Sequence, residues 1–271
     1  MGERIIDAWI QHPTPEMLAD PMFASLRKWA GLKTVPKAFP LALTQGLLDA
    51  GGVERAMLTA WWGPRGPLVT NDQVAEWVAA LPDRLVGVAA VDLHRPMDAV
   101  RELRRAVNEL GFRALRMLPW LWDAPPDDRR YYPLYAACVD LGIPFCLQVG
   151  QTGPIAPSEP GRPIPYLERV CLDFPELVVV AGHIGHPWTD EVLGMAHKFE
   201  NLWIDTSAYK PSRYPAVLVD YLRRPRHKVL FGSNAPMIQP RACLDQLDAL
   251  GLDPEPRERF LSANAAQVFG L

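Results

Sequence analysis

Residues 228–237 read KVLFGSNAPM, and this stretch decides what fold we expect. The run KVLF is short and apolar, and a Gly-Ser turn ends it, which is typical of a buried β-strand. Asn234 follows at the point where the strand stops. In a barrel of parallel strands the active site lies at such C-terminal strand ends. Asn234 is therefore a candidate site residue if the rest of the chain predicts a barrel.

Seven further runs of this kind precede it: 4–10, 54–60, 84–92, 112–118, 143–149, 177–183 and 201–206. Helical patterns separate several of them, as in 98–111, 133–142 and 164–174. The alternation predicts an α/β fold, a (β/α)8 TIM-type barrel forming a single domain over 1–271. A doubly wound open sheet is the alternative, although no Gly-x-Gly-x-x-Gly follows the first strand.

One connection is much longer than the others. Residues 11–50 form a loop and helix excursion after the first strand, with a helix expected around 15–30. We expect this segment to lie over the barrel mouth.

Composition excludes several classes of function. The chain has 271 residues, 49% of them hydrophobic, and a net charge of -3. The length and apolar content suit one large core, and the missing basic surplus argues against a nucleic-acid partner. No apolar run approaches the roughly 18 residues of a membrane span. The start, MGERIIDAW, lacks the features of a signal peptide, and no cysteines stand at Cys-x-x-Cys spacing. We expect a cytoplasmic protein with reduced, buried cysteines.

The predicted strand ends collect a polar and aromatic set of side chains. In chain order these are Trp9, Gln11, Trp61, Trp62, Arg116, Trp120, Trp122, Gln148, Gln151, His183, His186, Trp188, Asp205, Ser207 and Asn234. Six of the nine tryptophans fall in this set. They could pack loops or cover a subunit interface, or they could wall a pocket for a planar or apolar ligand.

Several segments together resemble one enzyme family. They are IIDAWIQ, GFRALRMLP, GIPFCLQVG, VVVAGHIGHPW, NLWIDTSA, KVLFGSNAP and the terminal NAAQVFGL, in the family's order. The chain is similar to the amidohydrolase superfamily, in the branch that contains aminocarboxymuconate-semialdehyde decarboxylase and the resorcylate-type decarboxylases. The resemblance implies a (β/α)8 barrel with one metal ion, and a homodimer is a family-based expectation.

The family's metal ligands are mostly replaced here. The His-x-His of the first strand falls on Trp9 and Gln11, the fifth-strand histidine on Gln148 and the eighth-strand aspartate on Asn234, while His183 is kept. An indole N–H has no lone pair for a metal, and neutral amides bind Zn²⁺ poorly. We therefore expect no cofactor. The alternative is a divalent metal, such as zinc, held by His183 with His12, His186 or Asp205.

The remaining side chains support acid–base chemistry without a metal. His183 titrates nearest to neutral pH and is the expected general acid or base. Arg116 is expected to anchor a carboxylate, with Asn234 and Asp205 as further catalytic candidates. Each has a structural alternative: His183 could be held by the backbone, Arg116 could pair with acids inside the barrel, Asp205 could anchor a loop, and Asn234 could hold its own turn.

Gln11, Gln148, Gln151 and His186 are expected to orient the substrate, and Trp9, Trp61, Trp120, Trp122 and Trp188 to pack on it. We predict an enzyme that hydrolyses or decarboxylates a small cyclic or aromatic carboxylate, ester or lactone without a metal. Two alternatives stay open: an inactive barrel that binds an aromatic ligand or serves another enzyme as a subunit, and a metal-dependent hydrolase with atypical ligands.

Overall fold

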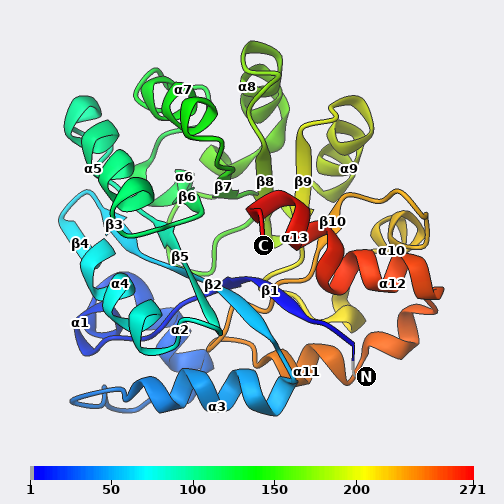
Figure 1. The fold of residues 1–271 in the computed structure, drawn as a ribbon, viewed down its shortest axis with the longest axis horizontal. Helices are drawn as coiled ribbons and strands as arrows, with labels where there is room; N and C mark the ends of the chain where they lie inside the picture. The colour runs from blue at the N-terminus through cyan, green and yellow to red at the C-terminus, as the bar shows by residue number, and fades with distance from the viewer. Residues whose placement is uncertain (1–2) are drawn as a thin grey trace.

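The computed structural model describes residues 3–271, which form one eight-stranded parallel barrel (Figure 1). The strands, in spatial order, are β1 (Ile6–Ile10), β2 (Arg55–Thr59), β5 (Leu85–Ala89), β6 (Ala114–Met117), β7 (Phe145–Gln148), β8 (Val179–Gly182), β9 (Leu202–Asp205) and β10 (Val229–Leu230). Ala8 N donates to Phe231 O at 2.8 Å, and Ile10 pairs with Ala235, so the last strand joins the first. The predicted barrel is confirmed, and each strand falls within its predicted run.

Helices fill the connections outside the ring. They are α1 (Pro15–Ala19), η1 (Pro21–Phe23), α2 (Ala24–Trp29), α3 (Leu41–Gly51), α4 (Asn71–Ala80), α5 (Pro96–Asn108), α6 (Pro119–Trp122), α7 (Tyr132–Leu141), α8 (Glu168–Asp173), α9 (Thr189–Lys198), α10 (Ala216–Leu222), α11 (Pro240–Leu244), α12 (Pro254–Glu258) and α13 (Asn264–Phe269), with short η turns at Glu159–Gly161, Pro163–Leu167, His183–Gly185, Pro211–Arg213, Leu247–Leu250 and Arg259–Ala263. In α5 the apolar spacing places Ala99, Leu103 and Ala106 against the barrel, as an amphipathic helix requires.

The barrel interior is filled by side chains and is not a pore. Its buried cluster takes alternate residues of the strands, as the two-residue period of a strand requires, together with one helix. The members include Ile6, Ala8, Met57, Val86, Val88, Ala114, Cys146, Val180, Trp203 and Leu230 from the strands, and Ala265, Val268 and Phe269 from α13. Helix α13 therefore closes the N-terminal end of the barrel, where Figure 1 shows it crossing the ring.

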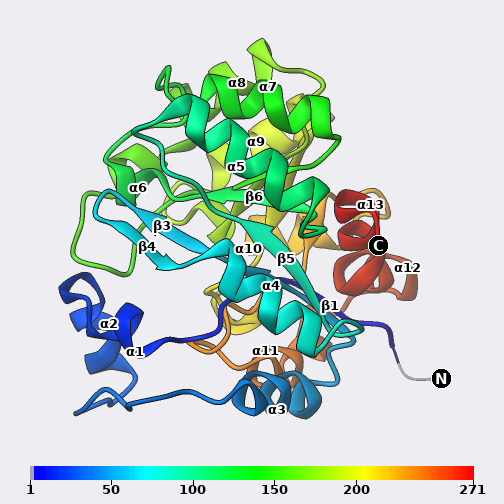
Figure 2. The same ribbon diagram turned by 60° about the vertical axis from the view of Figure 1, so that its left-hand side comes forward.

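The opposite end carries the long excursion. Helices α1 and α2 lie there beside a hairpin that the sequence did not predict, β3 (Trp61–Gly63) with β4 (Gly66–Val69) (Figure 2). The Asp20 carboxylate pairs with Arg65 of this hairpin at 2.6 Å. The two segments thus form a joint structure over the C-terminal strand ends, whereas α3 packs on α11 along the side of the barrel.

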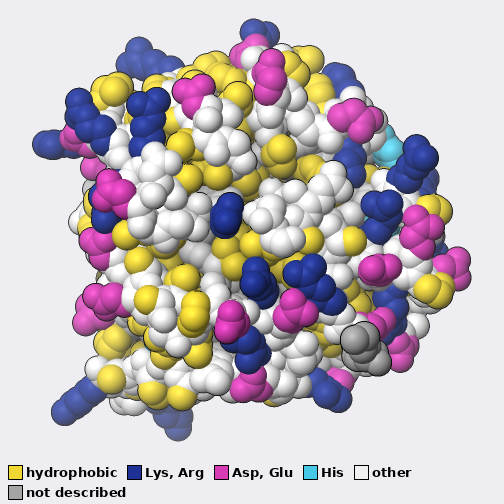
Figure 3. Space-filling view, in the orientation of Figure 1, with side chains coloured by type: hydrophobic (Ala, Val, Ile, Leu, Met, Phe, Trp, Pro, Cys, Tyr) yellow, Lys and Arg dark blue, Asp and Glu magenta, His cyan; other side chains and the backbone are white. Residues whose placement is uncertain are grey.

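On the face of the molecule that carries α13, no large surface patch consists of side chains of a single charge sign (Figure 3). Acidic and basic side chains are interspersed there (Figure 3), consistent with the small net charge. All four cysteines are buried and unpaired. Among the helices of residues 3–271, none combines the length and hydrophobicity needed to cross a bilayer.

Candidate active site

A cavity of about 450 Å³ opens at the C-terminal ends of the strands, beneath the α1–α2 segment. The strand ends and the loops after them contribute Trp9, Gln11, Trp61, Trp120, Gln148, Gln151, Thr152, Gly153, Pro154, His183, Ala208, Tyr209, Asn234, Pro236, Met237 and Ile238. The excursion contributes Pro13, Met17, Leu18, Phe23, Leu26, Trp29 and Ala30. Among residues 3–271, no lysine, arginine, aspartate or glutamate lines this cavity. It is an aromatic chamber with a few neutral polar groups.

Within the described residues 3–271, His183 is the one histidine in the cavity wall. It follows β8 in a left-handed backbone conformation, with φ of 68°, and its side chain lines the cavity. Its Nδ1 lies 2.7 Å from Ser207 Oγ, and its ring centroid lies 4.7 Å from that of Trp9. Burial, with a smaller effect from the Arg116 charge, lowers the pKa of His183 to about 3. The imidazole is therefore neutral at pH 7.

The amide side chains of Gln11, Asn234 and Gln148 form hydrogen bonds within the cavity wall. Gln11 Nε2 donates to Asn234 Oδ1 and to Ala235 O, both at 2.9 Å, and Gln11 Oε1 accepts from Trp9 Nε1 at 3.3 Å. Across the cavity, Trp120 Nε1 donates to Gln148 Oε1 at 2.8 Å. These bonds hold two indoles in place, as Gln and Asn can because they both donate and accept.

Arg116 does not line this cavity. Its Cζ lies 3.6 Å from the ring centroid of Trp9, and its Nη2 donates to Ala8 O at 2.9 Å. The side chain is 3% exposed, and burial lowers its pKa. On β6 it points into the barrel, where Trp9 covers it. The expected direct contact between Arg116 and a bound anion is therefore not available, because an indole lies between them.

Two buried carboxylates lie in the same interior region. Asp205 Oδ1 accepts from Ser207 N at 2.6 Å, and Asp7 Oδ1 accepts from Ser233 N at 2.9 Å. Burial raises the pKa of Asp205, and it raises the pKa of Asp7 to about 7. Neither lines the cavity, so Asp205 can act on a ligand only through the groups that it holds.

His12 and His186 lie away from the cavity. His12 Nδ1 is 2.7 Å from Thr44 Oγ1 and Nε2 is 3.1 Å from Phe39 O, so both ring nitrogens are engaged on the far side of the strand end. This is the face opposite to that of Gln11, as strand alternation requires. His186 is exposed, with its ring 5.8 Å from that of Tyr209.

The tryptophans divide into two groups. Trp9, Trp61 and Trp120 line the cavity as expected, whereas Trp122 packs edge-on against His94 at 5.1 Å. Trp188 lies 5.7 Å from the Arg162 guanidinium, outside the cavity wall. The positions of Trp122 and Trp188 agree with the structural alternative, in which tryptophans pack against loops.

The residues present do not fit a catalytic metal. Among residues 3–271, no group of three or more His, Cys, Asp or Glu side chains converges on a possible metal position. Of the alternative ligands, His12 is engaged with Thr44 and Phe39, His186 is exposed, and Asp205 does not line the cavity. The polar groups that line the cavity with His183 include the Trp9 indole and four amides, Gln11, Gln148, Gln151 and Asn234, which suit Zn²⁺ poorly.

The sequence did not identify the residues that the excursion contributes. Met17, Phe23, Leu26 and Trp29 form one wall, and Phe23 packs edge-on against Trp61 at 5.6 Å. The apolar spacing within 15–30 was the available signal, since it predicted a helix with a face to bury. Thr152 and Tyr209 were also missed, because they lie in loops without periodicity.

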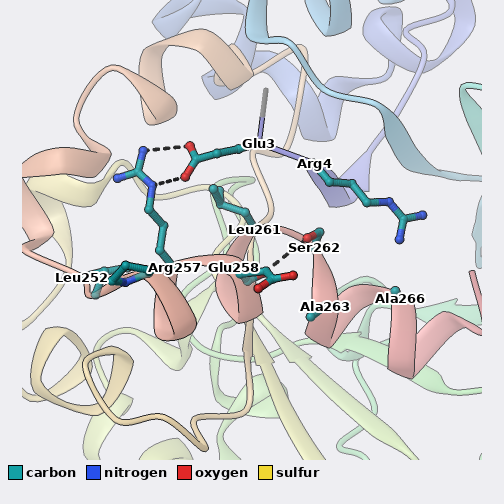
Figure 4. Close-up of a pocket in the computed structure, with 10 residues that line it drawn as sticks. Glu3, Arg4, Leu252, Arg257, Glu258, Leu261, Ser262, Ala263 and Ala266 are labelled. Atoms are coloured by element: carbon teal, nitrogen blue, oxygen red, sulfur yellow. Dashed lines mark hydrogen bonds and ion pairs between the residues drawn. The ribbon is translucent and has the colours of Figure 1, made fainter. Parts of the chain in front are cut away.

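A second cavity, of about 720 Å³, lies at the other end of the barrel (Figure 4). It is lined by Glu3, Arg4, Leu252, Pro254, Arg257, Glu258, Leu261, Ser262, Ala263 and Ala266. Arg257 is paired there with Glu3 and with Asp248. Although larger, this cavity lies at the N-terminal strand ends, and both of its lining arginines, Arg4 and Arg257, are paired with acidic side chains.

The comparison with known proteins agrees with this geometry. The model of the amidohydrolase family, Amidohydro_2, matches residues 6–271. The chain belongs to this amidohydrolase family. The prediction of an amidohydrolase-like enzyme is thereby confirmed at the level of the family.

Its relatives include named decarboxylases. A gamma-resorcylate decarboxylase of Rhodococcus jostii (strain RHA1) is 26% identical over 257 residues, which cover 74% of this chain and 75% of that protein. An uncharacterized TIM-barrel protein from Bordetella bronchiseptica superimposes with a TM-score of 0.83 at 26% identity, over 98% of both chains.

A third relative shows the fold of a metal-bound member. A dihydroxybenzoic acid decarboxylase from Polaromonas sp. JS666, solved with manganese and the inhibitor 2-nitroresorcinol, superimposes with a TM-score of 0.73 at 19% identity, over 100% of this chain and 98% of that one. This amidohydrolase therefore shares a barrel with a manganese protein, while its own donor set does not suit the metal.

Proposed function

We propose that this amidohydrolase decarboxylates a small aromatic carboxylic acid, with His183 carrying the proton and without a catalytic metal. The observation that carries the proposal is the cavity itself: aromatic walls, no charged lining residue and one neutral imidazole. The naming of several relatives as gamma-resorcylate decarboxylases supports the class of reaction.

The uncharged wall determines how the substrate binds. A carboxylate buried without a cation or several donors is strongly disfavoured, so the acid form is the one that enters. Burial also disfavours the imidazolium of His183, but transfer of the proton from the acid to the imidazole sets two opposite charges side by side, and their attraction offsets the cost of burying each. The carboxyl proton can therefore pass to Nε2, the ring nitrogen that Ser207 leaves free.

The same proton completes the reaction. The imidazolium transfers it to the ring carbon that bears the carboxylate, and ring π electrons form the new C–H bond. The C–C bond then breaks, its electron pair returns to the ring, and CO2 leaves. One acid gives one arene and one CO2, and His183 ends neutral.

Two features of the site favour this sequence. An imidazolium with a pKa of about 3 is a strong acid for a histidine, which suits transfer to a weakly basic ring carbon. The apolar surroundings also do not stabilise the carboxylate charge, which disappears as CO2 forms. Trp9, Trp61 and Trp120 provide flat surfaces for the ring, and Asn234 Nδ2 is available to a substrate oxygen.

The test is product analysis in D2O with a panel of benzoic acids, unsubstituted and with ring hydroxyl or methoxyl groups. We expect CO2 release and one deuterium at the vacated ring position. His183→Gln should lower kcat by about 100-fold or more, because a general acid–base group contributes that much. His197→Gln alters an exposed histidine outside the cavity and serves as the matched control.

Two outcomes would contradict the proposal. One is full activity in His183→Gln. The other is cleavage of esters or lactones with no acid decarboxylated, which would assign the neutral imidazole to activation of water in a hydrolase instead.

A further inference from the structure

The cavity at the C-terminal strand ends is larger than a single-ring acid requires. Its volume is about 450 Å³, whereas a dry cavity of roughly 150 Å³ is large enough to hold a benzene ring. A carboxyl group and a ring oxygen add only a few atoms to such a ring. A single-ring acid beside His183 would therefore leave much of the cavity to water, which apolar walls disfavour.

The inner and outer parts of this cavity differ in polarity. The strand ends supply the imidazole of His183 and the amides of Gln11, Gln148 and Asn234. The lining side chains of the α1–α2 segment, which forms the outer wall, are all apolar or aromatic: Met17, Leu18, Phe23, Leu26 and Trp29. A ligand that matches both parts is polar at one end and apolar at the other.

Contacts on two sides hold the apolar wall in place. The Asp20 carboxylate pairs with Arg65 of the β3–β4 hairpin at 2.6 Å. On the other side, Ser25 Oγ donates to the carbonyl of Gly153, in the loop after β7, at 3.0 Å. The α1–α2 segment is therefore attached to the loops around the barrel mouth, and the space beneath it is a built part of the fold.

Trp29 and Leu26 leave apolar surface uncovered in this outer part. Both side chains line the cavity, yet the Trp29 side chain is 67% exposed and Leu26 is only half-buried. Covering such surface with an apolar group of the ligand is favourable, because it removes both surfaces from water. A flat ring suits an exposed indole, since two aromatic groups bury large areas against each other.

We propose that the substrate is an aromatic acid with two rings, one bearing the carboxyl group beside His183 and the other lying against Leu26 and Trp29. The inference rests on the proposed function for the position of the carboxyl group, and it deepens that function by naming the size and shape of the acid. The second ring occupies the outer part of the cavity and displaces water from its apolar wall.

The experiment compares the Kd of benzoic acid with the Kd values of the meta and para isomers of biphenylcarboxylic acid, by calorimetry on the full chain at one pH. The added ring has the size of a phenylalanine side chain, and burying such a group changes an equilibrium constant by roughly 10- to 100-fold. We expect at least one biphenyl acid to bind more tightly than benzoic acid by this factor. Binding of both isomers no tighter than that of benzoic acid overturns the proposal.

Two variants of the wall show where the second ring binds. Leu26→Trp fills the outer part of the cavity and Trp29→Ala removes its exposed ring, so each should lower the ratio of the benzoic acid Kd to the biphenyl acid Kd severalfold. Trp29→Ala alters a mostly exposed side chain and so leaves the fold intact. Leu172→Trp, on α8 away from the cavity and 55% exposed, is the matched control and should keep the wild-type ratio. An unchanged ratio in both wall variants contradicts the proposal.

The result is separable from the proposed function. Tighter binding of a biphenyl acid without release of CO2 from any acid defeats only the proposed function. Decarboxylation of benzoic acids with no gain in affinity from a second ring defeats only this inference.

Discussion

The indole of Trp9 contacts two side chains of different charge, the Arg116 guanidinium and the His183 imidazole. On its inner face is the Arg116 guanidinium, with two acids of the barrel interior nearby, and next to it is the neutral imidazole of His183. The sequence placed these residues at the correct ends of the strands. It could not show that an indole covers the arginine, because that depends on side-chain packing across the barrel rather than on position along a strand.

Asp7 gives the clearest effect on stability. Its pKa is raised from 3.8 to about 7 in the folded protein, so the folded state holds the proton more tightly than the unfolded chain does. Asp7 therefore costs stability as the pH rises from about 4 to above 7. The displacement of about three pH units corresponds to roughly 4 kcal/mol at most.

We expect Asp7→Asn to be more stable than the wild-type protein above pH 7, and the difference to vanish below about pH 4. Urea unfolding of both proteins across this range measures it. Taking the difference removes the opposite contribution of His183, whose lowered pKa costs stability as the pH falls below 6.5. A difference independent of pH would mean that Asp7 does not titrate as described.

Trp61 tests recognition of the substrate ring. Its indole is 8% exposed and lines the cavity, and its Nε1 has no acceptor within residues 3–271. An oxygen substituent on the substrate could accept this hydrogen bond, worth about 1 kcal/mol.

Trp61→Phe should therefore raise KM about fivefold for hydroxylated or methoxylated acids and leave KM for the unsubstituted acid unchanged, in steady-state kinetics. An equal change in KM for both kinds of acid would show that the Trp61 ring, rather than its N–H group, contributes to substrate binding.

At the scale of elements, the α1–α2 segment forms the outer wall of the cavity. Short apolar runs separated by helical patterns predicted all eight strands, because parallel strands covered on both faces are apolar throughout. The same patterns did not reveal the β3–β4 hairpin, whose strands Trp61–Gly63 and Gly66–Val69 are too short for a periodic signal. Nor could they identify which residues of the excursion face the cavity.

Gly153 lies where this wall meets the barrel loops, and Ser25 Oγ donates to its carbonyl at 3.0 Å. An added Cβ would lie 3.1 Å from Leu26 Cδ2 and 3.4 Å from the Trp29 ring. Because both contacts are the ends of flexible side chains, Gly153→Ala should displace the wall rather than unfold the barrel.

We expect Gly153→Ala to raise KM severalfold with little change in Tm. Gly46→Ala is the matched control, since a Cβ there, within α3, meets nothing within 4 Å. That variant should raise Tm slightly, by the helix preference for alanine, and leave KM unchanged. Equal KM values for the two variants would show that α2 does not contribute to substrate binding.

At the scale of the whole molecule, the barrel is similar to that of a decarboxylase solved with manganese, and the polar groups that line its mouth in this chain include four amides. Three of these amides are held by hydrogen bonds: Gln11 bonds to Trp9 and to Asn234, and Gln148 bonds to Trp120. The sequence could place these amides at the strand ends, because each lies at the end of a short apolar run. It could not predict that the cavity contains no charge, since that required Arg116 and Asp205 to be located behind its wall.

The most direct test of the account is turnover of an aromatic carboxylic acid before and after removal of bound metal with a chelator, with metal content measured in parallel. We predict equal kcat in both preparations, no gain on adding Mn²⁺, and loss of turnover in His183→Gln. Loss of activity on metal removal and its recovery with Mn²⁺ would contradict an uncharged cavity in which His183 carries the proton.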